Sequence, residues 1–227
     1  MSYVFPPPHS VCIPVAGLEA AFPVRRVYCV GQNYALHAKE MGGDGRQPPF
    51  FFSKPADALV PEGGRVAFPP KTDNLQHEVE LVVALAEGGA NIPVEKALAH
   101  VFGYAIGIDL TRRDLQAAAK EKGRPWDMAK GFDQSGPISA IVPAATSGHP
   151  EKGRIWLSVN DVLKQDGDLA EMTWNVAEII ANLSTYVELA AGDLIFTGTP
   201  AGVSTVVRGD TLTCGIDGLG ELRVALV

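Results

Sequence analysis

Short apolar segments separated by glycine and proline dominate the hydrophobic pattern of this chain. Runs of roughly four to eight residues rich in valine, isoleucine and phenylalanine are typical of β-strands. We therefore predict strands at residues 26–30, 48–61, 77–85, 103–110, 155–160, 193–200, 211–216 and 221–227. The turn sequence DGLG joins the last two, which indicates a β-hairpin.

Helical periodicity is confined to short stretches. We predict helices at residues 33–43, 91–102, 111–122 and 174–187. The second begins near Pro93 and is closed by Gly103, positions that suit the start and end of a helix. The third has a capping-box sequence with Thr111 as the N-cap and an acidic residue three positions later.

The predicted strands outnumber the helices, and the two do not alternate regularly. This order favours a mixed, mostly antiparallel α+β fold with short inserted helices over a doubly wound nucleotide-binding sheet. The chain has 227 residues, of which 46% are hydrophobic, so it can bury a sizeable core. Without an internal repeat or linker, we expect one domain over residues 1–227, with residues 1–24 as an N-terminal extension packed on it.

The composition of the chain limits which binding partners and which cellular compartment we expect. The formal net charge is −7, which gives no basic surface for a nucleic acid, so a small-molecule substrate is a better expectation. The 3 cysteines are too few and too scattered for a disulfide framework, and this favours a reducing compartment. The start of the chain lacks a signal core, and no apolar run approaches the ~18 residues of a membrane span. We therefore expect a cytoplasmic protein without a membrane or nucleic-acid partner.

Several common catalytic motifs are absent from the sequence. It contains neither the GxSxG nor the SxxK pattern of serine hydrolases, and neither of the glycine-rich loops that bind phosphates. The 5 histidines are widely spaced, which argues against a histidine-rich metal site. Any metal would have to be held by carboxylates.

Three carboxylates are placed where a cation would compensate them. Glu78 and Glu80 lie two apart in HEVELVVAL, so in an extended chain both point to the same side. Asp109 ends an apolar strand that has no other charge, and a buried carboxylate is costly unless it is paired. Oxygen ligands alone suit Mg²⁺ or Mn²⁺. The alternative is that the Glu-x-Glu pair is a solvated strand edge.

Further polar residues are candidates for contacts near such a metal. If the chain turns helical after Asp109, then Arg113 and Gln116 project from the same face toward it. Lys130 lies in the sequence MAKGFD, where it can approach the cluster or remain a surface residue.

Two more motifs carry candidate chemistry. His37 and Glu40 are three apart on a predicted helix, so they can share a proton and activate water, or form an ordinary surface contact. The turn FTGTPAGV offers the hydroxyls of Thr197 and Thr199 and its backbone N–H groups to an anion, unless it is a plain turn. Lys54 has no assignment.

Taken together, these segments resemble the fumarylacetoacetate hydrolase family. The match covers most of the chain, and the order and spacing of its pieces are specific. Those pieces are NYALHAKE, FFSKP, HEVELVVAL, GYAIGIDLTRRDLQ, AKGFD, GDLIFTGTPAGV and GDTLTCGIDGLGEL. Residues 23–42 and 48–61 look most like the bacterial fumarylpyruvate hydrolases of gentisate breakdown. One segment departs from the family pattern QxGxTxxMIF, because it keeps Gln165, Gly167 and Met172 but not the threonine.

The resemblance implies a β-roll fold, usually in a homodimer, and a set of site residues. The implied ligands of Mg²⁺ or Mn²⁺ are Glu78, Glu80 and Asp109. The implied substrate contacts are Arg113, Gln116, Lys130 and Thr199. The resemblance also implies that His37 and Glu40 form a dyad on a segment that orders as a lid.

The expected activity is metal-dependent hydrolysis of a carbon–carbon bond in a 2,4-dioxo acid. Fumarylpyruvate, which would give fumarate and pyruvate, is the first candidate substrate. In this scheme Glu40, oriented by His37, is the general base, and Lys130 stabilises developing negative charge. An oxaloacetate decarboxylase, a keto/enol isomerase and a non-catalytic organic-acid binding protein are the alternatives.

Overall fold

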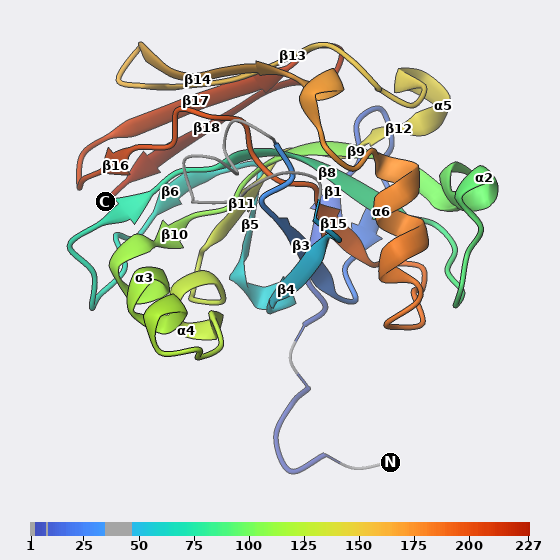
Figure 1. Cartoon of the computed structure of the whole chain (residues 1–227), viewed down its shortest axis with the longest axis horizontal. Coiled ribbons are helices and arrows are strands. Elements are labelled where there is room, and N and C mark those ends of the chain that lie inside the picture. Colours follow the sequence, from blue (N-terminus) through green and yellow to red (C-terminus); the bar gives the residue numbers. More distant parts are fainter. Residues whose placement is uncertain (1–2, 8, 35–46) are drawn as a thin grey trace.

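The computed structural model describes residues 3–7, 9–34 and 47–227. It is a mixed α+β fold dominated by mostly antiparallel strands, as the sequence predicts (Figure 1). The central sheet has eight strands in the order β4-β3-β15-β8-β9-β11-β5, and β12 pairs with β9. These strands are β3 (Val27–Gly31), β4 (Phe50–Lys54), β5 (Leu59–Pro61), β8 (Val79–Leu85), β9 (Val101–Ile108), β11 (Gly136–Ile138), β12 (Val142–Pro143) and β15 (Leu194–Phe196).

A five-stranded sheet lies over one face of the central sheet (Figure 1). In the order β14-β13-β17-β18-β6, its strands are β14 (Val162–Asp168), β13 (Arg154–Val159), β17 (Thr211–Ile216), β18 (Gly220–Leu226) and β6 (Gly64–Val66). The predicted hairpin is confirmed, because β17 and β18 pair antiparallel across the DGLG turn. There are also two small sheets. One consists of β1 (Cys12–Pro14) and β2 (Ala21–Pro23). In the other, β7 (Leu75–Gln76) lies between β10 (Thr111–Arg112) and β16 (Thr205–Val206).

The described helices are short. They are α2 (Val94–Ala97), α3 (Arg113–Glu121), α4 (Asp127–Lys130), α5 (Ala144–Ser147) and α6 (Val176–Leu183), with single 3₁₀ turns η1 (Ala56–Ala58), η2 (Leu98–His100) and η3 (Leu169–Glu171). Helix α6 begins at a capping box formed by Asn175 and Glu178 and packs its apolar face into the core. None of the described helices has the length and apolar character needed to cross a bilayer.

Strand β8 is buried on both faces, which explains its continuous apolar sequence. Leu81 and Val83 pack into the core between the two large sheets, whereas Val82 and Ala84 pack into a second core on the opposite face. Gly107 of β9 lies opposite Glu80, and a Cβ atom there would come within 2.4 Å of the Phe196 ring. This close packing fixes β8, β9 and β15 against one another.

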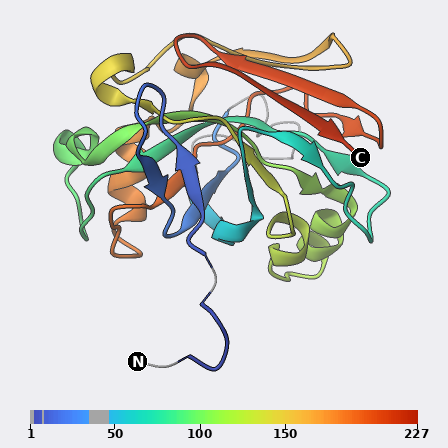
Figure 2. The same ribbon diagram turned by 180° about the vertical axis from the view of Figure 1, so that it is seen from behind.

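The N-terminal segment has two parts. Strands β1 and β2 form a hairpin whose Ile13 and Phe22 enter the second core. Before it, residues 3–7 are exposed and extend away from the body of the protein (Figure 2).

Three local predictions are wrong, each because of a tertiary contact. The helix expected over residues 91–102 ends by His100, since Val101 and Phe102 already belong to β9. Thr111 does not cap α3, because it lies in β10 and its hydroxyl donates to the carbonyl of Asp109. The segment 48–61 is not one core strand: β4 is an edge strand, and η1 and β5 follow it.

Candidate metal centre and its pocket

The three predicted carboxylates meet at one place. Each of Glu78, Glu80 and Asp109 is buried and offers an oxygen, and these oxygens lie within 4.8 Å of one another. Strands β8 and β9 cause this convergence, because Glu78 just before one strand faces Asp109 just after the other, and the Asp109 N–H donates to the Glu78 carbonyl at 2.8 Å. The interpretation as a solvated strand edge is therefore wrong.

Lys130 lies at the centre of the cluster rather than on the surface. Its ammonium is buried and donates to Glu78 Oε2 at 2.7 Å, to Asp109 Oδ2 at 2.6 Å and to Thr111 Oγ1 at 2.6 Å. Burial by itself would lower the pKa of Lys130, but the charges of Asp109 and Glu78 outweigh it and the pKa is raised. Lys130 is therefore a firmly charged donor beside two of the carboxylates.

A second lysine, missed by the sequence analysis, supports Asp109 from the other side. Lys54 ends β4, is buried, and places its ammonium 2.8 Å from Asp109 Oδ1. The same ammonium donates to the Lys130 backbone carbonyl. The signal was present in FFSKP, where a lysine closes an apolar strand, but its partner lies far along the chain.

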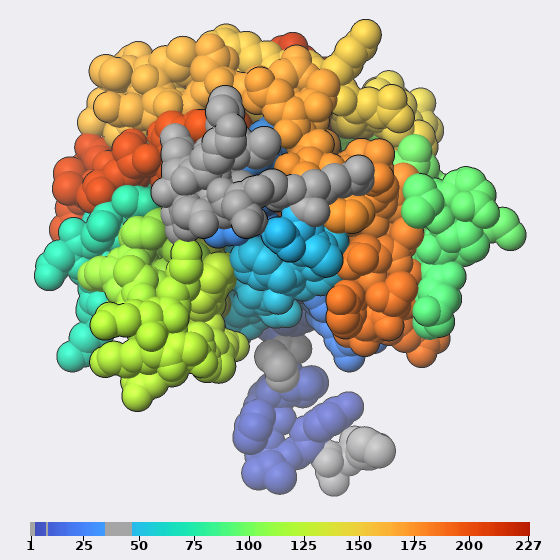
Figure 3. Space-filling model, in the orientation of Figure 1, coloured from blue at the N-terminus to red at the C-terminus, as the bar shows by residue number. Residues whose placement is uncertain are grey.

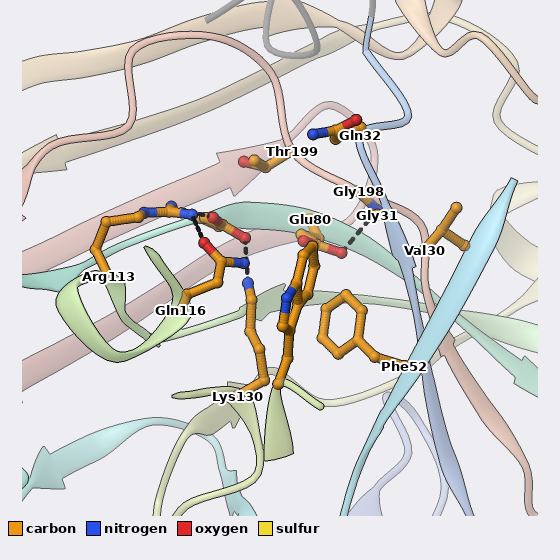
Figure 4. A pocket seen from close by; sticks show the side chains of 12 residues that line it. Val30, Gly31, Gln32, Phe52, Glu80, Arg113, Gln116, Lys130, Gly198 and Thr199 are labelled. Atoms are coloured by element: carbon orange, nitrogen blue, oxygen red, sulfur yellow. Dashed lines mark hydrogen bonds and ion pairs between the residues drawn. The ribbon is translucent and has the colours of Figure 1, made fainter. Parts of the chain in front are cut away.

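Arg113 and Gln116 project from α3 toward the cluster, as predicted. The Arg113 guanidinium forms an ion pair with Glu78, donates to Gln76 Oε1 at 2.6 Å, and donates to Gln116 Oε1 at 2.5 Å. The same guanidinium thus binds the Glu78 carboxylate and the Gln116 side-chain oxygen. Because the guanidinium can only donate, Gln116 must point its oxygen toward Arg113. Figure 4 shows both side chains on the same side of the pocket as Lys130.

Glu80 differs from the other two carboxylates. Its Oε2 accepts the Gly198 N–H at 2.7 Å, but no cation among the described residues pairs with it. Burial, together with the charges of Asp109 and Glu78, raises the pKa of Glu80 well above its usual range. Among the described residues, Glu80 therefore lacks the cationic partner that Glu78 and Asp109 have. A divalent cation held by the three carboxylates would compensate its charge, so the donor set fits Mg²⁺ or Mn²⁺.

Gln165 is another residue that the sequence analysis did not assign. It comes from β14 of the five-stranded sheet and is completely buried. Its Nε2 donates to Thr199 Oγ1 and to the Pro200 carbonyl, both at 2.8 Å. Its Oε1 accepts the N–H of Val79, the residue between Glu78 and Glu80, at 3.1 Å. One amide therefore ties the metal-ligand strand to the turn after β15.

The same amide also fixes the protonation of His77. Gln165 Oε1 can only accept, so His77 Nδ1, 2.8 Å away, must carry the proton. His77 Nε2 lies 2.9 Å from the Ser204 hydroxyl. Burial lowers the pKa of His77 despite its contact with Gln165, so the ring stays neutral and holds its place by hydrogen bonds.

A small pocket opens above the carboxylates. Its polar lining includes Arg113, Gln116, Lys130 and Thr199, and its apolar walls are Val30, Gly31, Phe52 and Trp126. Figure 4 shows Glu80 at the base of this pocket, with Gly198 and Thr199 above it.

The threonines of the turn after β15 are engaged within the protein. Thr197 donates its hydroxyl to the Leu81 carbonyl at 2.9 Å, and Thr199 donates its hydroxyl to the Val79 carbonyl at 2.7 Å. Thr199 lines the pocket, so its remaining lone pair and the backbone of the turn face the cavity. His37 and Glu40, predicted as the base dyad, lie outside the described residues, so their assignment stays a prediction.

Comparison with known proteins decides the family. The family profile described as "Fumarylacetoacetate (FAA) hydrolase C-terminal" matches residues 26–227. The chain belongs to the fumarylacetoacetate hydrolase family.

Relatives of this chain within the family are named for two different activities. A fumarylpyruvate hydrolase of Ralstonia sp is 44% identical over 177 residues, which cover 78% of this chain and 92% of the relative. A mitochondrial oxaloacetate tautomerase of Mus musculus is 43% identical over 199 residues, covering 88% of this chain and 90% of the relative. Identity alone therefore does not separate the two activities.

Solved structures of the family confirm the fold. The fumarylpyruvate hydrolase of Pseudomonas aeruginosa, solved with Mn²⁺ and pyruvate, is 50% identical, with a TM-score of 0.97 over 100% of this chain and 99% of that chain. A putative fumarylpyruvate hydrolase from Burkholderia cenocepacia is 54% identical, with a TM-score of 0.94 over 100% of this chain and 98% of that chain.

Proposed function

We propose that this chain is a divalent-metal-dependent acylpyruvate hydrolase that cleaves fumarylpyruvate into fumarate and pyruvate. The observation that carries the proposal is the buried group of Glu78, Glu80 and Asp109, placed beneath a pocket with cationic and amide walls. The relative from Pseudomonas aeruginosa, which has this fold and was solved with Mn²⁺ and pyruvate, supports it.

In the proposed reaction the three carboxylates would hold Mg²⁺ or Mn²⁺. When bound, the metal supplies Lewis acidity that polarises the 2-oxo group of the substrate. Arg113 brings a positive charge to the pocket wall that would attract the substrate carboxylate, and the Gln116 amide lies beside it. Lys130 is held charged in the pocket wall, so it can stabilise negative charge that develops on the substrate.

The hydrolytic step needs a base that activates water. We assign this role to Glu40, oriented by His37, from the sequence. Water adds to the distal carbonyl carbon, the bond between C3 and C4 breaks, and C3 takes up a proton to give pyruvate. The carbonyl carbon that accepted the water leaves as the carboxylate of fumarate. A positioned base contributes on the order of 10²–10⁴-fold to such a step.

Turnover of oxaloacetate is the second candidate function. It is favoured by relatives of similar identity that are named oxaloacetate tautomerase and, in Dictyostelium discoideum, oxaloacetate decarboxylase. These reactions would use the same metal and the same cationic pocket walls, but no attacking water.

The test uses the full chain stripped of metal with EDTA and then supplied with Mg²⁺ or Mn²⁺. Fumarylpyruvate, acetylpyruvate and oxaloacetate are offered separately, and loss of the enol absorbance is followed together with the products. We expect metal-dependent release of pyruvate from the acylpyruvates. Failure to cleave any acylpyruvate with either metal, while oxaloacetate is turned over, would establish the second candidate instead.

A substitution separates the two chemistries within one protein. Glu40→Gln should abolish hydrolysis of acylpyruvates while leaving decarboxylation of oxaloacetate largely intact, because only hydrolysis needs the activated water. Glu95→Gln, on an exposed position of α2, is the matched control and should change neither rate. Equal loss of both activities in Glu40→Gln would remove Glu40 from the role of base.

We also propose that the protein acts as a homodimer in the cytoplasm and serves the breakdown of aromatic compounds through gentisate. The family resemblance supports the dimer and the pathway, and the few scattered cysteines support a reducing compartment. Sedimentation of the purified chain tests the oligomer, and cell fractionation tests the compartment.

A further inference from the structure

A second hollow adjoins the metal pocket along the free edge of β4. It is open to solvent, has a volume of about 470 Å³, and is lined by the four residues 50–53, the four residues 124–127 and Lys130. Phe52, Trp126 and Lys130 line both hollows, so the two hollows are immediate neighbours. Figure 3 shows α3 and α4 beside β4 on this face of the molecule.

The walls of this groove are aromatic. The Trp126 ring lies edge-on to Phe50, with ring centroids 5.4 Å apart, and is tilted against Phe52 at 5.8 Å. Flat apolar walls suit a planar, conjugated chain, which buries both faces without leaving polar groups unpaired.

Arg124 brings a positive charge to this groove. It is exposed, and none of the described residues forms an ion pair with its side chain. Its backbone N–H donates to the Ala119 carbonyl at 2.8 Å, and Pro125 follows it, which restricts its backbone. Both features hold the start of the Arg124 side chain at the groove.

The other charged groups of the groove have defined roles. The Lys130 ammonium is engaged by Glu78, Asp109 and Thr111, so it is directed to the metal pocket. Asp127 also lines the groove, and its negative charge partly offsets the positive charge of Arg124 there. Of the described lining residues, Arg124 is thus the cation left to meet an anion in the groove.

We propose that this groove receives the acyl arm of the substrate and that Arg124 binds a carboxylate at the end of that arm. The proposal rests on the function proposed above and specifies its substrate class: acylpyruvates with an extended arm that ends in a carboxylate. Guanidinium suits this role because its planar fork matches a carboxylate. Asp127 limits the affinity, since it repels the same anion.

The contact lies away from the reacting atoms, so it should act on binding in the ground state and transition state alike. Removing it should raise KM and leave kcat nearly unchanged. Because Arg124 is exposed, water screens the pair, and we expect a change of about tenfold rather than more.

The experiment compares two substrates in matched variants of the full chain with Mn²⁺. Fumarylpyruvate ends in a carboxylate, whereas acetylpyruvate ends in a methyl group. In Arg124→Ala, the ratio of kcat/KM for fumarylpyruvate to kcat/KM for acetylpyruvate should fall by about tenfold through KM, and Arg124→Lys should recover part of it. Asp127→Asn should raise the same ratio.

Lys122→Ala is the control, because Lys122 is an exposed cation two positions away that does not line the groove. An unchanged ratio in Arg124→Ala, or an equal fall in Lys122→Ala, would overturn the Arg124 proposal while leaving the hydrolase function in place. If the unmodified enzyme cleaves neither substrate, the proposed function fails, and the Arg124 proposal falls with it.

Discussion

The two large sheets contribute very differently to the site. The eight-stranded sheet supplies all three carboxylates at the ends of β8 and β9, and Lys54 from β4. From the five-stranded sheet, the described contacts with this site come through one side chain, Gln165. The charged groups lie where the strands are buried on both faces and cannot shift. The second sheet instead covers the core and, through Gln165, aligns strand β8 with the turn after β15.

Substituting a carboxylate of the central sheet should have the largest effect. Glu80→Gln removes the carboxylate that pairs with no cation in the described part of the chain, so the variant should lose measurable Mn²⁺ binding and about a thousandfold or more of its activity. Calorimetric titration with Mn²⁺ and steady-state rates measure both. Glu87→Gln, an exposed residue just beyond β8, is the matched control. Mn²⁺ binding by Glu80→Gln at the affinity of the unmodified chain would contradict the assigned ligand set.

Metal binding should stabilise the protein through the same sheet. At a metal concentration of about 100 times Kd, binding to the native state alone adds about 2.7 kcal/mol to the free energy of unfolding. For a chain of this size that raises Tm by roughly 5–10 °C. Thermal denaturation with EDTA and with Mn²⁺ measures the shift, which Glu80→Gln should abolish. An equal shift in that variant would place the bound metal elsewhere.

The contribution of the five-stranded sheet is tested by Gln165→Ala. The substitution removes the acceptor of the Val79 N–H and of His77 Nδ1, and Thr199 loses a donor. We expect a loss of about 1–3 kcal/mol in the free energy of unfolding, with a higher KM because Thr199 is less well held. Urea denaturation and substrate titration report the two effects. Lys164→Ala, at the exposed neighbouring position, serves as the control. An equal response in that variant would mean that Gln165 does not position Thr199.

The smallest effect is expected at the exposed side of β14. Val162 and Leu163 are 56% and 46% exposed and belong to the edge strand that also carries Gln165. Replacing either by threonine should change the free energy of unfolding by no more than about 0.5 kcal/mol, and kcat should not change. A loss of activity in these variants would mean that the edge of the second sheet does more than carry Gln165.

The sequence predicted the convergence of the three carboxylates better than their surroundings, and the reason is local periodicity. Glu78, Glu80 and Asp109 lie at strand ends, and strand ends can be inferred from apolar runs. Lys54 and Gln165 reach the site from remote strands, so no short-range pattern indicates their partners. Thr111 matched a capping box, but its contacts with Asp109 and Lys130 took precedence over local propensity.

The pairing of β8 with β9 has a consequence for folding. Glu78 faces Asp109 and Glu80 faces Gly107 only in one alignment, and a slip by a single residue would turn every side chain of β8 to the opposite face. A misaligned chain would therefore be unable to assemble the carboxylate cluster. A metal ion held by this cluster, as proposed, would therefore also stabilise the correct strand pairing, because it would bind only chains in which β8 and β9 are aligned in this register.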